Sequence, residues 1–389
     1  MTILRGIGAV VLLLGVGVSR ADESAPKKAY QELLGQFSVE TPGLGLDSHF
    51  QGESDQAMTY GLVLWAEAIR YDAEPTDNGK ARIRAAAQWL YTNRDLDEDG
   101  RPGWGLPKAY DTWGDGSMNP IHTPYTITTA LCLLGMIEAN QHAGIWSEDE
   151  QSKYRALVKE TVLNWSRSAW TKGYGGGYFW YSPNPNDRIY CVNPSSVMLA
   201  AIVAAVARQP DSFSDQERAF LESRADETLK ALIETVQMRE GAPYWRYAPL
   251  PNAFGHDRPN DALHQAYTLW GIETYRDHWN RVDIPWTRAQ SIESVDRYTR
   301  EGKPYLLPQD IPANRESARL DRLWGRGMVL AFYAKWGDEA RAARTLDELM
   351  TFYGDWPRLK EWPTDGNNAP FFPRQAAHVL LGLSMMCFE

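Results

Sequence analysis

Residues 123–137 read TPYTITTALCLLGMI, and residues 193–206 read NPSSVMLAAIVAAV. In each stretch a residue with a side-chain oxygen, Thr123 or Asn193, is followed by proline. This pair predicts an N-cap and a first helical turn, because proline there removes no intrahelical hydrogen bond. The residues that follow are apolar on nearly every face, as in helices that protein surrounds on all sides. Both stretches therefore predict buried, inner helices.

Helices of the opposite kind alternate with the buried ones. The ranges 149–168, 214–238 and 338–352 each combine a charged face with an apolar face, which predicts outer helices that cover a core. Loops rich in glycine and aromatic residues lead into helix starts near Gln56, Thr123, Asn193, Asn260, Arg315 and Arg374. Almost no period-2 alternation bounded by hairpin turns is present. We therefore expect an all-α fold, an (α/α)6 toroid with its cleft where the N-terminal ends of the inner helices meet.

The N-terminus has the pattern of an export signal. Residues 1–21 contain one early cation, Arg5, an apolar run over 7–18, and small residues around the last position, Ala21. This pattern predicts cleavage after Ala21 and a periplasmic or secreted protein. Residues 22–389 contain no linker-like tract and no apolar run of about 18 residues, the length a membrane helix needs. We expect them to form one domain that does not span a membrane.

Charge and cysteine content narrow the functional classes. The 389 residues have a formal net charge of −10 at pH 7, which disfavours nucleic acid as a partner. The three cysteines, Cys132, Cys191 and Cys387, lie in or beside apolar helical runs. We expect buried free thiols rather than a disulfide framework.

The densest group of candidate site residues lies in residues 103–125, GWGLPKAYDTWGDGSMNPIHTPY. Aromatic rings in an ordered loop often line a groove, and their faces stack on the C–H faces of sugars. We expect Trp113 and Asp115 to face the cleft, with His122 and Tyr125 as candidate proton-transfer groups. Packing between loops is the alternative explanation for about half of these rings.

Two later loops have a similar composition. The candidates in residues 174–193 are Tyr178, Trp180, Tyr181 and Arg188, and those in residues 244–267 are Trp245, Arg246, Arg258, Asn260, Asp261 and His264. Asn260 and His264 are four residues apart and share a face of the predicted helix. Asp261 is alternatively only a capping acid at the start of that helix. The glycines of the first loop lack the lysine and the preceding strand of a phosphate-binding loop.

A stripe of arginines points to an anionic ligand. Arg315, Arg319, Arg322 and Arg326 follow spacings of three and four residues in the fifth predicted inner helix, beside Trp324. Arg374 and His378 repeat the spacing of four in the sixth. Because arginine binds carboxylate and sulfate through two hydrogen bonds, the stripe predicts an acidic polysaccharide or oligosaccharide. Salt bridges to Glu316 and Asp321 are the competing explanation.

Metal and cofactor signals are weak. Asp95, Asp97 and Asp99 resemble the first half of a calcium loop, but Leu106 occupies the position of the bidentate glutamate. An acidic connecting turn is the preferred interpretation. The sequence has neither an HExxH helix nor paired CxxC motifs, so we expect no zinc site and no cofactor.

The repeats and aromatic loops of residues 22–389 resemble bacterial (α/α)6-toroid carbohydrate-active enzymes, including uronate polysaccharide lyases and glucuronyl C5-epimerases. The resemblance is one of pattern and implies no particular catalytic residue. Lyases and C5-epimerases both remove the proton at C5 of a uronate, which needs a base and a group that neutralises the carboxylate.

The residues leave three functions open. For proton abstraction, the candidate acids and bases are His122, His264, Tyr125 and Tyr181, and the candidate neutralisers are Arg246, Arg258, Arg319 and Asn260. An inverting glycoside hydrolase would use a carboxyl pair, for which the candidates are Asp115 and Asp261. A non-catalytic protein that binds an exopolysaccharide during export would keep the aromatic and arginine contacts alone.

Overall fold

The computed structural model describes residues 24–389 except 250–258, 311–317, 355 and 367. The predicted signal peptide and the candidates Arg258 and Arg315 lie outside the described residues. No helix in the described part of the chain is long and apolar enough to cross a membrane.

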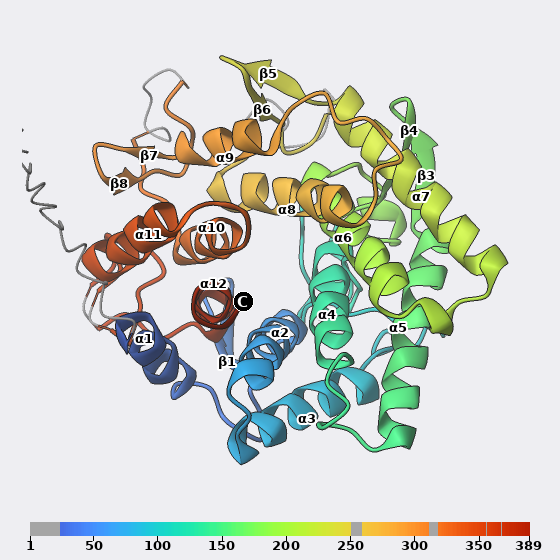
Figure 1. Cartoon of the computed structure of the whole chain (residues 1–389), viewed down its shortest axis with the longest axis horizontal. Helices are drawn as coiled ribbons and strands as arrows, with labels where there is room; N and C mark the ends of the chain where they lie inside the picture. The colour runs from blue at the N-terminus through green and yellow to red at the C-terminus, as the bar shows by residue number, and fades with distance from the viewer. Residues whose placement is uncertain (1–23, 250–258, 311–317, 355, 367) are drawn as a thin grey trace, which may run out of the picture.

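Six helices form an inner ring in which each packs against the next (Figure 1). They are α2 (Ala57–Ala73), α4 (Thr126–Ala139), α6 (Val192–Arg208), α8 (Ala262–His278), α10 (Leu323–Trp336) and α12 (Pro373–Phe388). The ring closes because α12 packs against α2. All six helices are buried over most of their length, as their apolar sequences predict.

Six further helices form an outer ring around the first (Figure 1). They are α1 (Ser24–Leu34), α3 (Asp77–Thr92), α5 (Glu148–Ser168), α7 (Asp215–Glu234), α9 (Arg288–Asp296) and α11 (Glu339–Phe352). Helix α1 packs on α12, and each later outer helix packs on the inner helix that precedes it in the chain. The (α/α)6 toroid predicted from the sequence is confirmed.

Glycines allow the inner helices to approach closely. A Cβ atom on Gly61 of α2 would lie 2.8 Å from the Cα of Cys132 in α4, and one on Gly135 would lie 2.3 Å from the carbonyl oxygen of Gly61. A Cβ atom on Gly271 of α8 would lie 1.9 Å from the carbonyl oxygen of Ser196 in α6. Because these contacts are to backbone atoms, any larger residue would push neighbouring helices apart.

The predicted N-caps Thr123 and Asn193 are wrong by two residues in each case. The N-caps are Tyr125 and Cys191, and neither uses a side-chain cap. The hydroxyl of Thr123 instead donates to the carbonyl oxygen of Pro120 at 2.9 Å. Asn193 lies within the first turn of α6, where backbone N–H groups have no intrahelical partner and the following proline is still tolerated.

The predicted fifth inner helix starts too early. Helix α10 begins at Leu323 rather than near Arg315. Leu320 instead pairs with Tyr305 in a short antiparallel bridge, and the N–H of Leu306 donates to the carbonyl oxygen of Arg319 at 2.9 Å. Arg319 and Arg322 therefore precede the helix, and the predicted helical stripe of arginines does not form.

Four two-stranded hairpins, which the sequence analysis missed, precede inner helices. They pair β1 (Leu44–Asp47) with β2 (Phe50–Asp55), β3 (Trp170–Gly173) with β4 (Gly176–Phe179), β5 (Gln237–Arg239) with β6 (Ala242–Tyr244), and β7 (Thr299–Arg300) with β8 (Lys303–Pro304). Three of the turns share one device. Both central residues of each turn have positive φ, as a two-residue type I′ hairpin turn requires. These residues are Tyr174-Gly175, Glu240-Gly241 and Glu301-Gly302.

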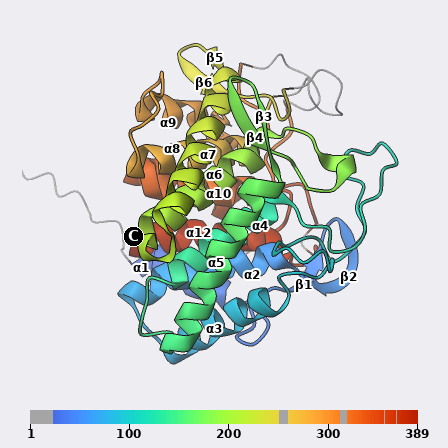
Figure 2. The same ribbon diagram turned by 90° about the vertical axis from the view of Figure 1, so that its right-hand side faces the viewer.

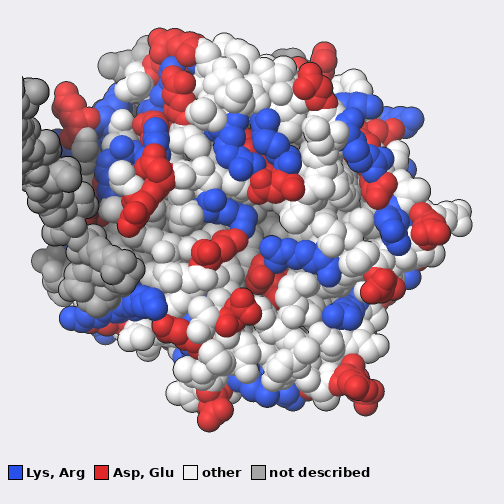
Figure 3. Space-filling view, in the orientation of Figure 1, with Lys and Arg blue, Asp and Glu red and all other residues white. Residues whose placement is uncertain are grey.

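The long loops that lead into the inner helices converge on one side of the toroid, together with the first hairpin. Figure 2 shows β1 and β2 on the side opposite the C-terminus. Since each inner helix follows such a loop, the N-terminal ends of the inner ring open on this side. The other face, on which the C-terminus lies, has acidic and basic side chains interspersed (Figure 3). The C-terminal ends of the inner helices carry the ion pairs Glu138 to Arg208 and Lys335 to Glu389.

Candidate functional site

A cavity of about 110 Å³ lies at the N-terminal ends of the inner ring. Every inner helix contributes to its wall: Met58 from α2, Ile127 from α4, Asn193 from α6, His264 from α8, Trp324 from α10 and His378 from α12. The predicted position of the site, where the inner helix starts converge, coincides with this cavity.

Aromatic and imidazole groups dominate the wall. The rings are those of Tyr110, Tyr125, Tyr181, Tyr247, Tyr267, Trp324, His49, His264 and His378. Arg374 is the one charged side chain among the described residues that line the cavity, and none of these residues is a carboxylate. Such a wall suits a sugar ring, whose C–H faces stack on aromatic rings.

His264 is held by the residue that starts its own helix. The carboxylate of Asp261 accepts the backbone N–H of His264 at 3.0 Å, as the N-cap of α8. Its Oδ1 also lies 2.6 Å from Nδ1 of His264. A carboxylate only accepts, so Nδ1 carries the proton of the neutral ring and Nε2 keeps its lone pair. Nε2 makes no hydrogen bond within the described residues, and the ring of Tyr247 packs edge to face on the imidazole at 4.7 Å between centroids.

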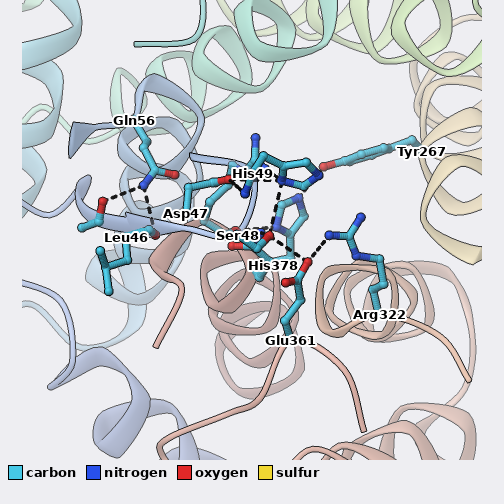
Figure 4. Close-up of polar contacts among 12 residues, drawn as sticks. Leu46, Asp47, Ser48, His49, Gln56, Tyr267, Arg322, Glu361 and His378 are labelled. Carbon is cyan, nitrogen blue, oxygen red and sulfur yellow. Dashed lines mark hydrogen bonds and ion pairs between the residues drawn. The ribbon is translucent and has the colours of Figure 1, made fainter. Parts of the chain in front are cut away.

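His49 is held by an arginine. It follows Asp47 in the turn between β1 and β2 (Figure 4), and Nη2 of Arg374 lies 2.8 Å from its Nδ1. Oδ1 of Asp47 lies 3.1 Å from the same nitrogen but already accepts the backbone N–H of His49 at 2.8 Å. The shorter contact, from a group that only donates, makes Nδ1 the acceptor and places the ring proton on Nε2.

Asp47 balances the charge of Arg374. Its Oδ2 lies 2.7 Å from Nε of Arg374, and both side chains are buried. Burial raises the pKa of Asp47, but its contacts with His49 and the charge of Arg374 outweigh this effect, so the pKa of Asp47 lies below its ordinary value. The pair therefore places no net charge beside the cavity.

His378 is fixed inside the inner ring of helices by hydrogen bonds to both of its nitrogens. Its Nδ1 lies 2.8 Å from the carbonyl oxygen of Arg374, and its Nε2 lies 2.5 Å from the hydroxyl of Tyr267. Burial lowers the pKa of His378 to about 3. The imidazole is therefore neutral at physiological pH, with Nδ1 donating to the carbonyl and Nε2 accepting from Tyr267.

The arginines that suggested an acidic substrate are mostly paired with acids. Arg322 pairs with Glu361, which also accepts the hydroxyl of Ser48 at 2.9 Å (Figure 4). Arg326 is fully buried and pairs with Glu348. Salt bridging, the competing explanation, thus holds for these two and for Arg374, although with acids other than those named from the sequence.

Two of the predicted proton-transfer groups lie away from the cavity. Asp115 is fully exposed in a turn, where its carboxylate accepts the backbone N–H of Ser117 at 2.9 Å. His122 lies in a separate pocket beside Trp89 and Trp104. Tyr125, Tyr181 and His264 line the central cavity as predicted, and Asp261 lies directly behind His264.

Several predicted sugar contacts serve packing between loops. Trp113 packs with Cys191 and Ala248 in a small cluster against Tyr181 and Tyr247. Tyr178 stacks on Tyr190 with 4.4 Å between centroids. Trp245 is buried and donates to the carbonyl oxygen of Leu232 at 2.8 Å.

The remaining predicted contacts surround the cavity at a distance. Arg188 lies over the ring of Trp180 at 4.6 Å, both outside the cavity wall. Asn260 is buried, and its backbone carbonyl oxygen accepts a hydrogen bond from the hydroxyl of Tyr298 at 2.7 Å. Arg246 is exposed and does not line the cavity. Trp324, Arg374 and His378 line it as the sequence predicts.

Sequence reasoning missed His49 and Tyr267; Tyr247 belongs to the aromatic loop of residues 244–267 but was given no role. His49 follows Asp47-Ser48 in a glycine-rich loop that leads into the first inner helix, the same context that selected the later loops. Tyr267 follows His264 by three residues, so both share one face of α8. The same face rule that paired Asn260 with His264 would have found Tyr267.

The acidic run Asp95, Asp97 and Asp99 forms a compact cluster. Oxygen atoms of the three carboxylates lie within 4.8 Å of one another. Burial and the charges of its neighbours raise the pKa of Asp97 to about 6. The calcium site and the expectation of no cofactor stay predictions.

Comparison with known proteins gives no match to a protein-family model and none among curated sequences. Solved structures do match over nearly the whole chain. A D-mannose isomerase has a TM-score of 0.61 at 14% identity, covering 94% of this chain and 98% of its own. An unsaturated glucuronyl hydrolase specific for heparin has a TM-score of 0.54 at 13% identity, covering 94% and 96%. An α-1,6-mannanase of Salegentibacter sp., in complex with α-1,6-mannotriose, has a TM-score of 0.58 at 9% identity, covering 94% and 99%.

The chain has the fold of these toroidal carbohydrate-active enzymes. The neighbours include hydrolases and an isomerase, so the fold agrees with the predicted class of protein and leaves the reaction open.

Proposed function

We propose that the chain is a carbohydrate-active enzyme that removes a proton from a sugar carbon next to a carbonyl or carboxyl carbon. The observation that supports this most strongly is His264, whose Nε2 keeps a lone pair while Asp261 holds Nδ1 at 2.6 Å. A histidine oriented in this way by a carboxylate is a suitable general base near neutral pH.

The two histidines of the wall can divide the proton transfers. Nε2 of His264 accepts the proton from carbon, and Nε2 of His49 bears a proton that it can donate to the developing oxyanion. Their opposite tautomers are assigned from their partners, since Asp261 only accepts, and Arg374, the nearer of the two groups that contact Nδ1 of His49, only donates. Tyr125 and Tyr181 add hydroxyl groups to the same wall.

If the substrate is a uronate, the enzyme would be a lyase or a C5-epimerase. If the substrate is a free sugar, it would be an isomerase or an epimerase. Incubation with pectate, alginate and hyaluronan should give an unsaturated product that absorbs in the ultraviolet if the enzyme is a lyase, or a new epimer visible by NMR if it is an epimerase. Free aldoses and ketoses, analysed by NMR, test the isomerase form. A full set of substrates returned unchanged would reject proton abstraction.

A glycoside hydrolase is the second candidate, because a buried carboxyl group lies behind the wall. Asp187 accepts the hydroxyl of Thr112 at 2.8 Å and the amide of Asn119, and Asn119 also donates to the hydroxyl of Tyr125 at 2.9 Å. Burial raises the pKa of Asp187, as a general acid requires. Asp261 would be the second carboxylate in place of the exposed Asp115. New reducing ends without any unsaturated product, lost in Asp187→Asn, would support this candidate over proton abstraction.

The predicted leader would place this activity outside the cytoplasm. Expression of the full chain with determination of the mature N-terminus should give a protein that begins at Asp22 in the periplasm or medium. A cytoplasmic protein that retains residues 1–21 would contradict export.

A further inference from the structure

Three arginines and two tryptophans form a stacked ladder that leads out of the cavity. The guanidinium of Arg374 lies 5.2 Å from the ring centroid of Trp324, and that of Arg322 lies 4.4 Å from the same ring. Arg322 also lies 4.8 Å from the ring of Trp362, and Arg319 lies over Trp362 at 3.6 Å. Arg374 and Trp324 line the cavity, so Arg319 is the outer end of the ladder.

Among the three arginines of this ladder, Arg319 alone carries a charge that no described carboxylate neutralises. Arg374 is neutralised by Asp47 and Arg322 by Glu361. The side chain of Arg319 is exposed and makes no ion pair or hydrogen bond with any residue that the structure describes. An anionic group on the substrate would therefore be attracted to Arg319 rather than to the cavity itself.

The stacking orients the guanidinium for a ligand. A face that lies on an indole ring leaves the N–H groups at the edge of the guanidinium to donate, and this edge matches the two oxygens of a carboxylate. The backbone around the indole is fixed by hydrogen bonds. Trp362 is half-buried, and its backbone N–H donates to Oδ2 of Asp365 at 2.9 Å. The carbonyl oxygen of the preceding residue, Glu361, accepts the N–H of Leu323 at 2.9 Å.

We propose that Arg319 and Trp362 form an outer subsite that binds the carboxylate of an acidic sugar unit while the neighbouring unit occupies the cavity. The indole supplies a stacking surface and the guanidinium edge supplies the two hydrogen bonds. This inference rests on the proposed function only in taking the ligand to be a carbohydrate. It assigns the preference for acidic chains to Arg319, since the inner arginines are already paired.

The test is a binding measurement that needs no turnover. Oligosaccharides from pectate, alginate and hyaluronan, each with its carboxyl-reduced neutral counterpart, are titrated by calorimetry into the wild type, Arg319→Gln and Arg167→Gln. Arg167 is the matched control, because it is exposed and lies over Phe220 at 5.7 Å on the outer helix α5. We expect at least one acidic oligosaccharide to bind, with about tenfold weaker binding in Arg319→Gln and unchanged binding in Arg167→Gln.

Each other outcome overturns the proposal. Equal binding of an acidic oligosaccharide and its reduced counterpart would show that no carboxylate is recognised. Binding that survives in Arg319→Gln would place recognition elsewhere, and failure of every acidic oligosaccharide to bind would remove the subsite. Because binding is measured without turnover, a wild type that binds as expected but leaves all substrates unchanged would reject the proposed reaction and keep the subsite.

Discussion

The two histidines that inner helices α8 and α12 present to the cavity differ in burial and in the partners of their ring nitrogens. His264 is partly exposed, is held by the carboxylate of Asp261, and keeps a lone pair on Nε2. His378 is fully buried, and both of its nitrogens are occupied by the Arg374 carbonyl oxygen and the Tyr267 hydroxyl. Burial and partners, rather than residue type, make the first a candidate base and the second a structural element.

The largest expected effect comes from removing His264, the candidate base of this comparison. His264→Gln should lower turnover by about 10²-fold or more, because a general base typically contributes that much to the rate. His142→Gln is the matched control, since His142 also pairs with an acid, Asp72 at 3.5 Å, but lies outside the cavity wall. Initial rates on the substrate found by screening measure both. Turnover by His264→Gln equal to that of the control would remove His264 from the reaction.

The buried, neutral state of His378 predicts that the protein loses stability in acid. The pKa of His378 is about 3 in the folded protein and about 6.5 when exposed in the unfolded chain. The unfolded state therefore binds an extra proton between these values, so stability falls as the pH drops from about 6.5 towards 3, with a slope of up to about 1.4 kcal/mol per pH unit. Urea unfolding at several pH values should show a shallower slope in His378→Gln. An unchanged slope would show that His378 is not held neutral.

Removing the hydroxyl that His378 accepts should cost stability while leaving catalysis in place. In Tyr267→Phe the buried Nε2 of His378 loses its donor, and the free energy of unfolding should fall by about 1–3 kcal/mol. Turnover by the folded variant should be retained, because neither group is assigned a proton transfer. Denaturant titration and initial rates measure the two effects. A large loss of turnover in a fully stable Tyr267→Phe would move Tyr267 into the chemistry.

The smallest effect separates the two roles of Asp261. Asn is as good an N-cap as Asp, so Asp261→Asn should leave the stability of α8 within about 0.5 kcal/mol of the wild type. Loss of the negative charge should lower turnover about tenfold, because the imidazolium formed at His264 is no longer stabilised. Thermal unfolding and initial rates distinguish the roles. If turnover is unchanged along with stability, Asp261 is a capping residue only, which was the alternative drawn from the sequence.

The helical periodicity was sufficient to predict the toroid and the position of its cavity, because fully apolar helices can only be inner ones. The fifth helix start was misplaced because an arginine stripe with helical spacing also fits an extended segment, and the bridge between Tyr305 and Leu320 decides for the latter. Tertiary pairing of this kind leaves no local signal.

The residues that line the cavity were easiest to predict where they lie in the first turns of inner helices, as His264, Trp324 and Arg374 do. Loop residues were harder. Asp115 and Trp113 lie in the same aromatic loop as Tyr125, but neither lines the cavity. Asp115 is exposed in a turn, and Trp113 packs in a small cluster of buried residues. The pairing of Arg374 with Asp47 joins residues more than 300 positions apart, which spacing alone does not reveal.

Hydrogen exchange with solvent tests the central claim most directly. The protein is incubated in D2O with the uronate oligosaccharides and free sugars, and deuterium in the recovered sugars is located by NMR and mass spectrometry. Proton abstraction by His264 predicts either deuterium at a single carbon next to the carbonyl or carboxyl group, as in an epimerase or isomerase, or an unsaturated product whose same carbon has lost its hydrogen, as in a lyase. Neither product should form with His264→Gln. New reducing ends with neither deuterium on carbon nor an unsaturated end, or binding without any chemical change, would contradict it.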